Sequence, residues 1–154
     1  EGIAFEIVPG ITAAVAAGAY AGIPLTHREH APGVRFLTAH PAEGLDEPDW
    51  QSWARTSDTL AIYMGLARCA VVGHELLRHG RDAATPVALV ENATLPGQRV
   101  ILGRLGELHQ LPMNHRLRSP TLLIVGNVAG LANTLHWFGQ PPVATDAARE
   151  ALVA

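Results

Sequence analysis

The chain has 154 residues, of which 48% are hydrophobic and 16% charged, with a formal net charge of −3 and no lysine. This composition excludes an intrinsically disordered chain and is typical of one globular domain with a sizeable core. No basic run or arginine-rich tail is present, so nucleic acid is not an expected partner.

The predicted elements begin with a short extended segment at residues 4–8. Thr12 then caps an alanine-rich helix that runs to Ala21 and ends at Gly22. Short apolar runs predict five strands, at residues 34–39, 59–64, 86–90, 98–103 and 121–125. Apolar residues at helical spacing predict further helices at residues 49–55, 66–79, 105–111 and 128–138. Residues 140–154 are expected to be a tail.

Strands that alternate with helices predict an α/β fold, with helices on both faces of the sheet. A turn at residues 92–97 predicts a hairpin among strands that are otherwise joined by crossovers, so the five-stranded sheet is expected to be mixed. Ligands gather beyond the carboxyl ends of strands in such sheets. The residues that follow Met64 and Val90 are therefore the first places to look for a site.

Residues 7–25 carry no charged side chain and are long enough to suggest a membrane span. Pro9, Gly10, Gly18 and Gly22 interrupt the segment, which favours a helix of a soluble domain and no membrane partner.

A metal site is not expected from the sequence. Cys69 is the only cysteine, which excludes an intrachain disulfide and a multi-cysteine metal site and favours a reducing, cytoplasmic compartment. Among the eight histidines, His27 and His30 are three residues apart, and His74 and His79 are five apart. Neither spacing resembles a four-ligand structural site, so scattered surface histidines are the favoured interpretation.

A series of short segments in fixed order is more specific than any of these patterns. The segments are Val8-Pro9-Gly10-Ile11-Thr12-Ala13-Ala14, Gly22-Ile23-Pro24-Leu25-Thr26-His27-Arg28, Tyr63-Met64-Gly65, Glu91-Asn92, Gln98-Arg99-Val100, Ser119-Pro120 and Ile124-Val125-Gly126. In this order and spacing, the chain resembles the tetrapyrrole methylase family over about residues 5–138. Within the family, the stretch that ends in His27-Arg28 favours the uroporphyrinogen-III C-methyltransferases.

The resemblance implies a two-domain, homodimeric enzyme that binds its methyl donor between the domains. Residues 1–139 look like the carboxy-terminal domain alone, followed by the tail at 140–154. The proton-transfer groups of the family belong to the amino-terminal domain, which we expect to be missing, so no catalytic residue is nominated in this chain.

The resemblance also implies which residues bind the donor, S-adenosyl-L-methionine, and its product, S-adenosyl-L-homocysteine. The matching positions are Thr12, Ala13, Met64 and Ala93. Without the resemblance, Thr12 would be interpreted as a helix cap and Met64 as a core residue. Relatives usually have glycine where this chain has Ala93 and Ala39, and a methyl group at position 93 would crowd the ligand or strain a backbone of positive φ.

For the tetrapyrrole substrate, Arg28 is the first candidate and His27 the second. A guanidinium pairs strongly with the acetate and propionate groups of a uroporphyrinogen. The alternative is a structural Arg28 that pairs with Glu29 or with a backbone carbonyl.

The implied reaction is methylation of uroporphyrinogen III at two pyrrole carbons to give precorrin-2, for sirohaem or cobalamin synthesis, without a bound metal. One alternative is a non-catalytic dimerisation or binding fragment. Another is a sister methylase that acts on a precorrin or on diphthamide.

Overall fold

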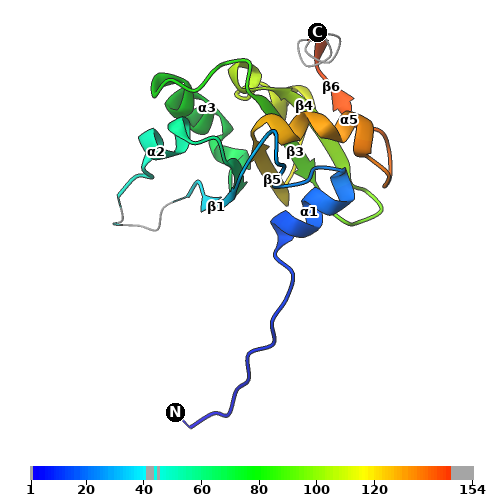
Figure 1. Cartoon of the computed structure of the whole chain (residues 1–154). Coiled ribbons are helices and arrows are strands. Elements are labelled where there is room, and N and C mark those ends of the chain that lie inside the picture. Colours follow the sequence, from blue (N-terminus) through cyan, green and yellow to red (C-terminus); the bar gives the residue numbers. More distant parts are fainter. Residues whose placement is uncertain (1, 41–43, 45, 147–154) are drawn as a thin grey trace.

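The computed structural model describes residues 2–40, 44 and 46–146 and shows an α/β fold, as predicted (Figure 1). One mixed sheet has the strand order β1-β2-β5-β3-β4-β6. The strands are β1 (Val34–Thr38), β2 (Thr59–Tyr63), β3 (Pro86–Glu91), β4 (Arg99–Arg104), β5 (Thr121–Val125) and β6 (Val143–Ala144).

The central strand of this arrangement is β5, which is antiparallel to both of its neighbours, β2 and β3. β1 pairs in parallel with β2, and β3 and β4 form the predicted antiparallel hairpin. Because β2 and β3 each run opposite to β5, they run in the same direction as each other. Their carboxyl ends therefore lie at the same edge of the sheet.

Helices cover both faces of the sheet, as predicted. The α-helices are α1 (Ala13–Ala21), α2 (Trp50–Arg55), α3 (Cys69–Arg78), α4 (Leu111–Asn114) and α5 (Ala132–Leu135). The described part of the chain also has the 3₁₀ turns η1 (Leu66–Arg68), η2 (Leu105–Glu107) and η3 (Asn127–Leu131).

Two hydrophobic cores lie on opposite faces of the sheet. Along β2, Leu60 and Ile62 belong to one core with residues of α2 and α3, while Ala61 belongs to the other with residues of α1, η3 and α5. This alternation follows from the two-residue side-chain period of a strand. Since all three side chains are fully buried, β2 reads in sequence as a continuous apolar run.

Several predicted elements differ from the structure. Val143–Ala144 forms a sixth strand beside β4 inside the predicted tail, of which residues 147–154 lie outside the described part. The helix predicted at 105–111 is instead the turn η2 followed by the separate helix α4. The helix predicted at 128–138 is η3 followed by α5 and ends at Leu135. Two-residue strands and 3₁₀ turns carry too little periodicity to be recognised in a sequence.

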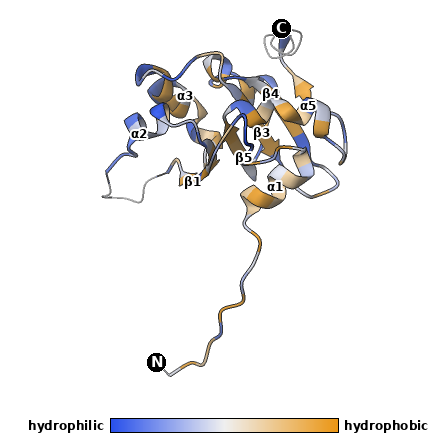
Figure 2. Cartoon of the chain, viewed as in Figure 1, coloured by the Kyte–Doolittle hydropathy of each residue, from blue (hydrophilic) through white to orange (hydrophobic). Residues whose placement is uncertain are grey.

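The segment before α1 is an extended arm that leaves the body of the domain (Figure 1). It forms no strand, and five of its apolar side chains are 78–85% exposed: Ile3, Phe5, Ile7, Val8 and Ile11. Figure 2 shows this hydrophobic character along the arm. Of the described helices, none has the length and apolar character needed to cross a membrane.

Gly22 ends α1, as the sequence predicts, and fixes the helix against α5. Its φ of 70° is left-handed, and its N–H donates to the carbonyl of Gly18. A Cβ atom at position 22 would lie 2.4 Å from the carbonyl carbon and oxygen of Leu135. Glycine is therefore required here both by the backbone conformation and by the close approach of α5.

We expect Gly22→Ala to lower the free energy of unfolding by more than about 1 kcal/mol, because a left-handed alanine alone costs roughly that much. Urea unfolding followed by circular dichroism measures the change. The matched control is Gly130→Ala, whose added Cβ meets no atom within 4 Å and which is expected to be neutral or slightly stabilising. Equal losses in the two variants would contradict this account of Gly22.

Candidate functional site

A cleft of about 630 Å³ opens at the edge where β2 and β3 end. This volume is within the range of about 300–1,000 Å³ that is typical of small-molecule sites. The lining residues are contributed by the start of α1, by the residues at and after the ends of β1, β2 and β3, and by the segment that enters β5. They are Ala13, His40, Tyr63, Met64, Leu66, Ala67, Val90, Ala93, Ser119, Pro120, Thr121 and Leu122.

Three of the four predicted donor-binding residues line this cleft. Ala13, Met64 and Ala93 come from three separate regions of the chain and converge there. The fourth, Thr12, precedes α1 and reaches the cleft through a hydrogen bond between its hydroxyl and that of Tyr63, a lining residue. The topology thus brings together positions that are up to 81 residues apart in the sequence.

Tyr63 fastens the start of α1 to the end of β2. The Ala14 amide donates to the Tyr63 hydroxyl at 2.9 Å, and the Thr12 hydroxyl binds the same oxygen. Thr12 is the N-cap residue of α1, but its side chain makes no capping bond, so the predicted side-chain cap is wrong. The tyrosine is a site residue that the sequence analysis missed, and its signal was its position immediately before Met64.

Met64 is not a core methionine. Its side chain is 61% exposed, and its backbone is left-handed, with a φ of 52°. A non-glycine residue in this region costs about 1 kcal/mol or more and persists only where the surrounding structure holds it. The conformation turns the chain sharply at the end of β2, which places a flexible thioether side chain at the cleft.

The predicted backbone strain at Ala93 is absent. The left-handed residues of this loop are its neighbours Asn92 and Thr94, with φ values of 49° and 69°, and Ala93 itself is not among the residues of positive φ. Ala39, the second departure from the family pattern, is fully buried, and its amide donates to the Tyr63 carbonyl at 3.0 Å. Both alanines therefore fit the backbone of this chain without a left-handed conformation.

Glu91 holds together the segments on the β3 side of the cleft. Its buried carboxylate accepts hydrogen bonds from Arg99 Nε and from the amide of Arg118, each at 2.6 Å. These two bonds tie the end of β3 to the start of β4 and to the segment that carries Ser119 and Pro120. The hydrogen bond from Arg99 is the main reason that the pKa of Glu91 lies below its usual value, and the Arg118 amide lowers this pKa further.

Gln98 fixes the loop that carries Ala93. Its side-chain oxygen accepts from the Thr94 amide at 2.7 Å, and its side-chain nitrogen donates to the Tyr20 carbonyl of α1 at 3.3 Å. The segments Glu91-Asn92, Gln98-Arg99 and Ser119-Pro120, which the sequence analysis used only as landmarks, therefore form one supporting structure around the cleft.

The ionisable side chains that line the cleft within the described residues are His40 and Tyr63. Neither was nominated from the sequence, although His40 directly follows Ala39, one of the two departures from the family pattern. The rest of the lining is mostly apolar, from Leu66, Val90 and Leu122 among others. Such a lining suits a ligand with extended apolar surface and few polar groups.

The predicted substrate residues, His27 and Arg28, lie away from this cleft. They belong to the loop before β1, at the amino-terminal end of that strand, whereas the cleft lies beyond its carboxyl end. The five residues of β1 span about 15 Å at roughly 3.3 Å per residue. Arg28 is exposed and makes no ion pair with Glu29 or with any other residue in the described part of the chain.

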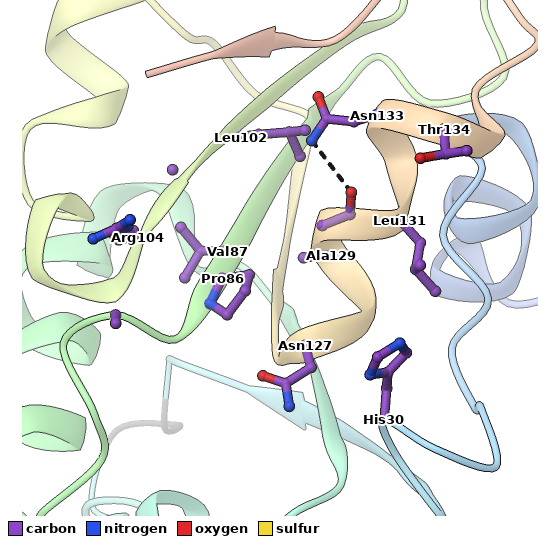
Figure 3. A pocket seen from close by; sticks show the side chains of 13 residues that line it. His30, Pro86, Val87, Leu102, Arg104, Asn127, Ala129, Leu131, Asn133 and Thr134 are labelled. Carbon is purple, nitrogen blue, oxygen red and sulfur yellow. Dashed lines mark hydrogen bonds between the residues drawn. The ribbon is translucent and has the colours of Figure 1, made fainter. Parts of the chain in front are cut away.

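A second, smaller pocket of about 280 Å³ lies at this opposite edge. Figure 3 shows its apolar floor of Pro86, Val87 and Ala129, with His30 and Asn127 at one end. None of the four predicted donor-binding residues lines it.

Comparison with known proteins places this geometry in a family. Residues 1–109 match the family model described as Tetrapyrrole (Corrin/Porphyrin) Methylases. The chain is 55% identical over 135 residues to a siroheme synthase of Pseudoalteromonas translucida, and the alignment covers 88% of this chain and 28% of that protein. It is 51% identical over 140 residues to siroheme synthase 3 of Aeromonas hydrophila, and that alignment covers 91% of this chain and 30% of the relative. The chain thus spans less than a third of these relatives.

Solved structures of methylases share the fold, and two of them show how closely. The uroporphyrin-III C-methyl transferase of Thermus thermophilus, complexed with S-adenyl homocysteine, aligns with a TM-score of 0.68 and 38% identity over 80% of this chain and 52% of its own. A cobalt precorrin-4 methyltransferase aligns with a TM-score of 0.73 and 25% identity over the same shares. The mixed sheet is therefore that of a methylase domain, as the resemblance implied.

We expect Glu91→Gln to lower the free energy of unfolding by about 1–2 kcal/mol at neutral pH, because it removes the charge from two hydrogen bonds and replaces one of the two accepting oxygens with an N–H donor. A carboxylate whose folded pKa is lowered stabilises the fold above its unfolded pKa, near 4.5, and loses that contribution as the pH falls through the folded pKa. The difference between wild type and variant should therefore be constant at neutral pH and shrink on acidification below about pH 4.

Urea unfolding at a series of pH values measures this difference. The matched control is Glu47→Gln, which removes a carboxylate that is 59% exposed and pairs with Arg68 at the surface. We expect that control to change stability by less than about 1 kcal/mol. A difference between wild type and Glu91→Gln that stays constant into strong acid would contradict the assigned role of the carboxylate.

Proposed function

The chain belongs to the tetrapyrrole methylases, and we propose that it forms the carboxy-terminal part of a uroporphyrinogen-III C-methyltransferase. The proposed reaction is the S-adenosylmethionine-dependent methylation of uroporphyrinogen III to precorrin-2, for sirohaem or cobalamin synthesis. The observation that carries the proposal is the cleft at which Ala13, Met64 and Ala93 converge. The names of the relatives support the substrate, and the ligand of the Thermus thermophilus enzyme supports the donor.

The residues of the cleft fit S-adenosylmethionine in size and chemistry. A volume of about 630 Å³ accommodates a nucleoside with an amino-acid side arm. Apolar side chains such as Val90 and Leu122 suit the adenine ring. The Ala13 N–H at the start of α1 has no acceptor among the described residues and is available to a polar ligand atom, whereas the next three amides are already bonded. The cleft therefore offers both the apolar surface and the polar contacts that S-adenosylmethionine requires.

S-adenosylmethionine supplies an electrophilic methyl group, which an electron-rich pyrrole carbon accepts. The residues of this chain hold and orient the reactants. Tyr63 keeps the start of α1 against the end of β2, and Glu91 and Gln98 hold the facing loop. Because a reduced pyrrole is already nucleophilic, positioning and exclusion of water are the main contributions that the cleft makes. The methylation itself requires no bound metal.

We infer that a second, amino-terminal domain closes the cleft and carries the proton-transfer groups, and that the assembled enzyme is a cytoplasmic homodimer. The chain spans about half of the Thermus thermophilus enzyme, which supports a further domain. The exposed apolar side chains of the arm, from Ile3 to Ile11, are also suited to burial against further protein.

Arg28 and His27 are proposed to bind the substrate at a distance from the methylated carbon. Arg28 is an exposed arginine with no ion pair among the described residues, so its guanidinium is available for a carboxylate. Because β1 separates the loop of Arg28 from the cleft, we propose that Arg28 binds an outlying acetate or propionate group of the tetrapyrrole.

The donor assignment predicts that the chain binds S-adenosylhomocysteine with micromolar affinity in isothermal titration calorimetry. Ala93→Leu extends a side chain into the cleft and should weaken binding by about tenfold or more, which corresponds to about 1.4 kcal/mol. Ala70→Leu is the matched control, because Ala70 is exposed on α3 and lines none of the pockets described above. Binding that Ala93→Leu leaves unchanged would place the ligand elsewhere, and a folded chain without binding would favour an inert fragment.

The substrate assignment predicts that the chain, joined to an amino-terminal methylase domain, converts uroporphyrinogen III to precorrin-2, as identified by product mass. Arg28→Ala should raise KM for uroporphyrinogen severalfold with a smaller effect on kcat, because it removes a binding contact remote from the reacting carbon. Arg55→Ala, at the exposed end of α2, should change neither constant.

A product that forms only from a precorrin or from diphthamide would identify a sister methylase instead. The structural likeness to a cobalt precorrin-4 methyltransferase makes a precorrin the first alternative substrate to assay.

A further inference from the structure

The loop between α1 and β1 forms a closed turn that leads into the sheet. The backbone groups of His27 and Ala31 exchange two hydrogen bonds: the His27 amide donates to the Ala31 carbonyl at 2.8 Å, and the Ala31 amide donates back at 2.9 Å. Ala31 is buried in the core on the α1 face. Both ends of the turn are thereby held, and the residues between them have restricted conformations.

Three potential metal-ligating side chains meet on this turn. The ligand atoms of His27, Glu29 and His30 all lie within 4.8 Å of one another. In the described ranges, no other three His, Cys, Asp or Glu residues bring their potential ligand atoms this close together. The two imidazole rings stack, with their centroids 4.7 Å apart and their planes at 29°. The three-residue spacing of the histidines, which in sequence argued against a metal site, therefore brings both rings to one side of a tight turn.

Local hydrogen bonding sets the tautomer of His27. Its Nδ1 accepts a hydrogen bond from the Glu29 amide at 3.2 Å, so in the neutral ring the proton lies on Nε2. A metal ion needs an unprotonated ring nitrogen, so binding at Nδ1 replaces the contact with the amide, and binding at Nε2 requires the proton to move to Nδ1. Either change gives up this one exposed contact and leaves His27 able to bind a metal ion.

We propose that His27, Glu29 and His30 bind a divalent transition-metal ion of the Zn²⁺, Ni²⁺ or Cu²⁺ class. Two imidazole nitrogens and one carboxylate oxygen are donors that these ions prefer, and three protein ligands leave at least one coordination position open. Ligands of one zinc ion lie about 2.0–2.2 Å from the metal and hence closer to one another than 4.8 Å. Because the Glu29 side chain is exposed, it can rotate and bring its carboxylate oxygen within bonding distance of the ion.

The site is separate from the cleft and does not rest on the proposed function. It shares His27 with the proposed substrate contacts, so a bound ion leaves Arg28 as the substrate contact on this turn. The metal site lies at the amino-terminal end of β1, whereas the cleft lies beyond the carboxyl end of that strand. His30 also lines the 280 Å³ pocket at this edge, together with Asn127 and Asn133 (Figure 3). An ion bound at His30 would therefore lie at the margin of a pocket that has room for water or for a small anion as a further ligand.

Isothermal titration of untagged protein with Zn²⁺ and with Ni²⁺ tests the proposal. We expect one equivalent of metal to bind with micromolar affinity. His30→Ala and Glu29→Gln should each weaken binding by about tenfold or more, since even second-shell changes cost 10–100-fold. Glu29 is exposed, so its variant retains the fold and stays informative if His30→Ala does not fold.

The matched control is the double variant His74→Ala/His79→Ala, on α3 and at its C-cap. These histidines also flank a glutamate, with nitrogens 3.8 Å and 3.7 Å from the Glu75 carboxylate, but the three do not form a metal-holding group. The control should bind metal as the wild type does. Equal loss in the control and in His30→Ala, or no binding by the wild type, would overturn the proposal.

Electron paramagnetic resonance of the Cu²⁺-loaded chain gives a second readout that depends on ligand identity. The wild type should show couplings from two imidazole nitrogens, and His30→Ala from one. An unchanged number of nitrogen couplings in a folded His30→Ala variant would assign the ion to other histidines and refute this site.

Discussion

The antiparallel placement of β5 between β2 and β3 is the constraint on which the rest of the structure depends. β5 pairs with Leu60–Ile62 of β2 on one side and with Val87–Glu91 of β3 on the other, and its side chains are almost all buried. Because both neighbours run opposite to it, the ends of β2 and β3 and the start of β5 meet at one edge of the sheet. The cleft lies where the chain leaves β2 and β3 and enters β5, and residues at these strand ends form its walls together with the start of α1.

Polar groups at the edge of the sheet need hydrogen-bond partners, and the buried carboxylate of Glu91 binds two of them. It accepts from Arg99 and from the Arg118 amide, and so joins three segments with one side chain. A buried charge is tolerated only when it is paired and hydrogen-bonded, which accounts for an arginine opposite this glutamate. Gln98 performs the same task with a neutral amide, between the Ala93 loop and α1. The left-handed residues Asn92 and Thr94 lie between these two supports.

The sequence predicted what depends on local pattern and missed what depends on contacts between distant residues. Apolar runs located the five longer strands, and the ordered landmarks located three residues that now line one cleft. The hydroxyl of Thr12 was assigned to a local helix cap but bonds to Tyr63, which is 51 residues away and which no local rule connects to it. The strand β6 has two residues and therefore no readable period. The His27–His30 spacing was judged against four-ligand sites, whereas a turn, not a helix, sets the distance between those rings.

The two edges of the sheet differ in chemical character, and this difference bears on how the chain functions. At the cleft edge the described lining is mostly apolar, with His40 and Tyr63 as its ionisable members, so it suits binding and orientation better than proton transfer. At the opposite edge the loop before β1 gathers two imidazoles, a carboxylate and the exposed Arg28. Under the proposed function, methyl transfer requires a dry, shaped cavity, of which the first edge would supply one wall. The exposed polar side chains of the second edge would suit a polar tetrapyrrole periphery or a metal ion. We infer from this division that β1 separates the reacting centre from the charged contacts, and that a wall from elsewhere completes the cleft.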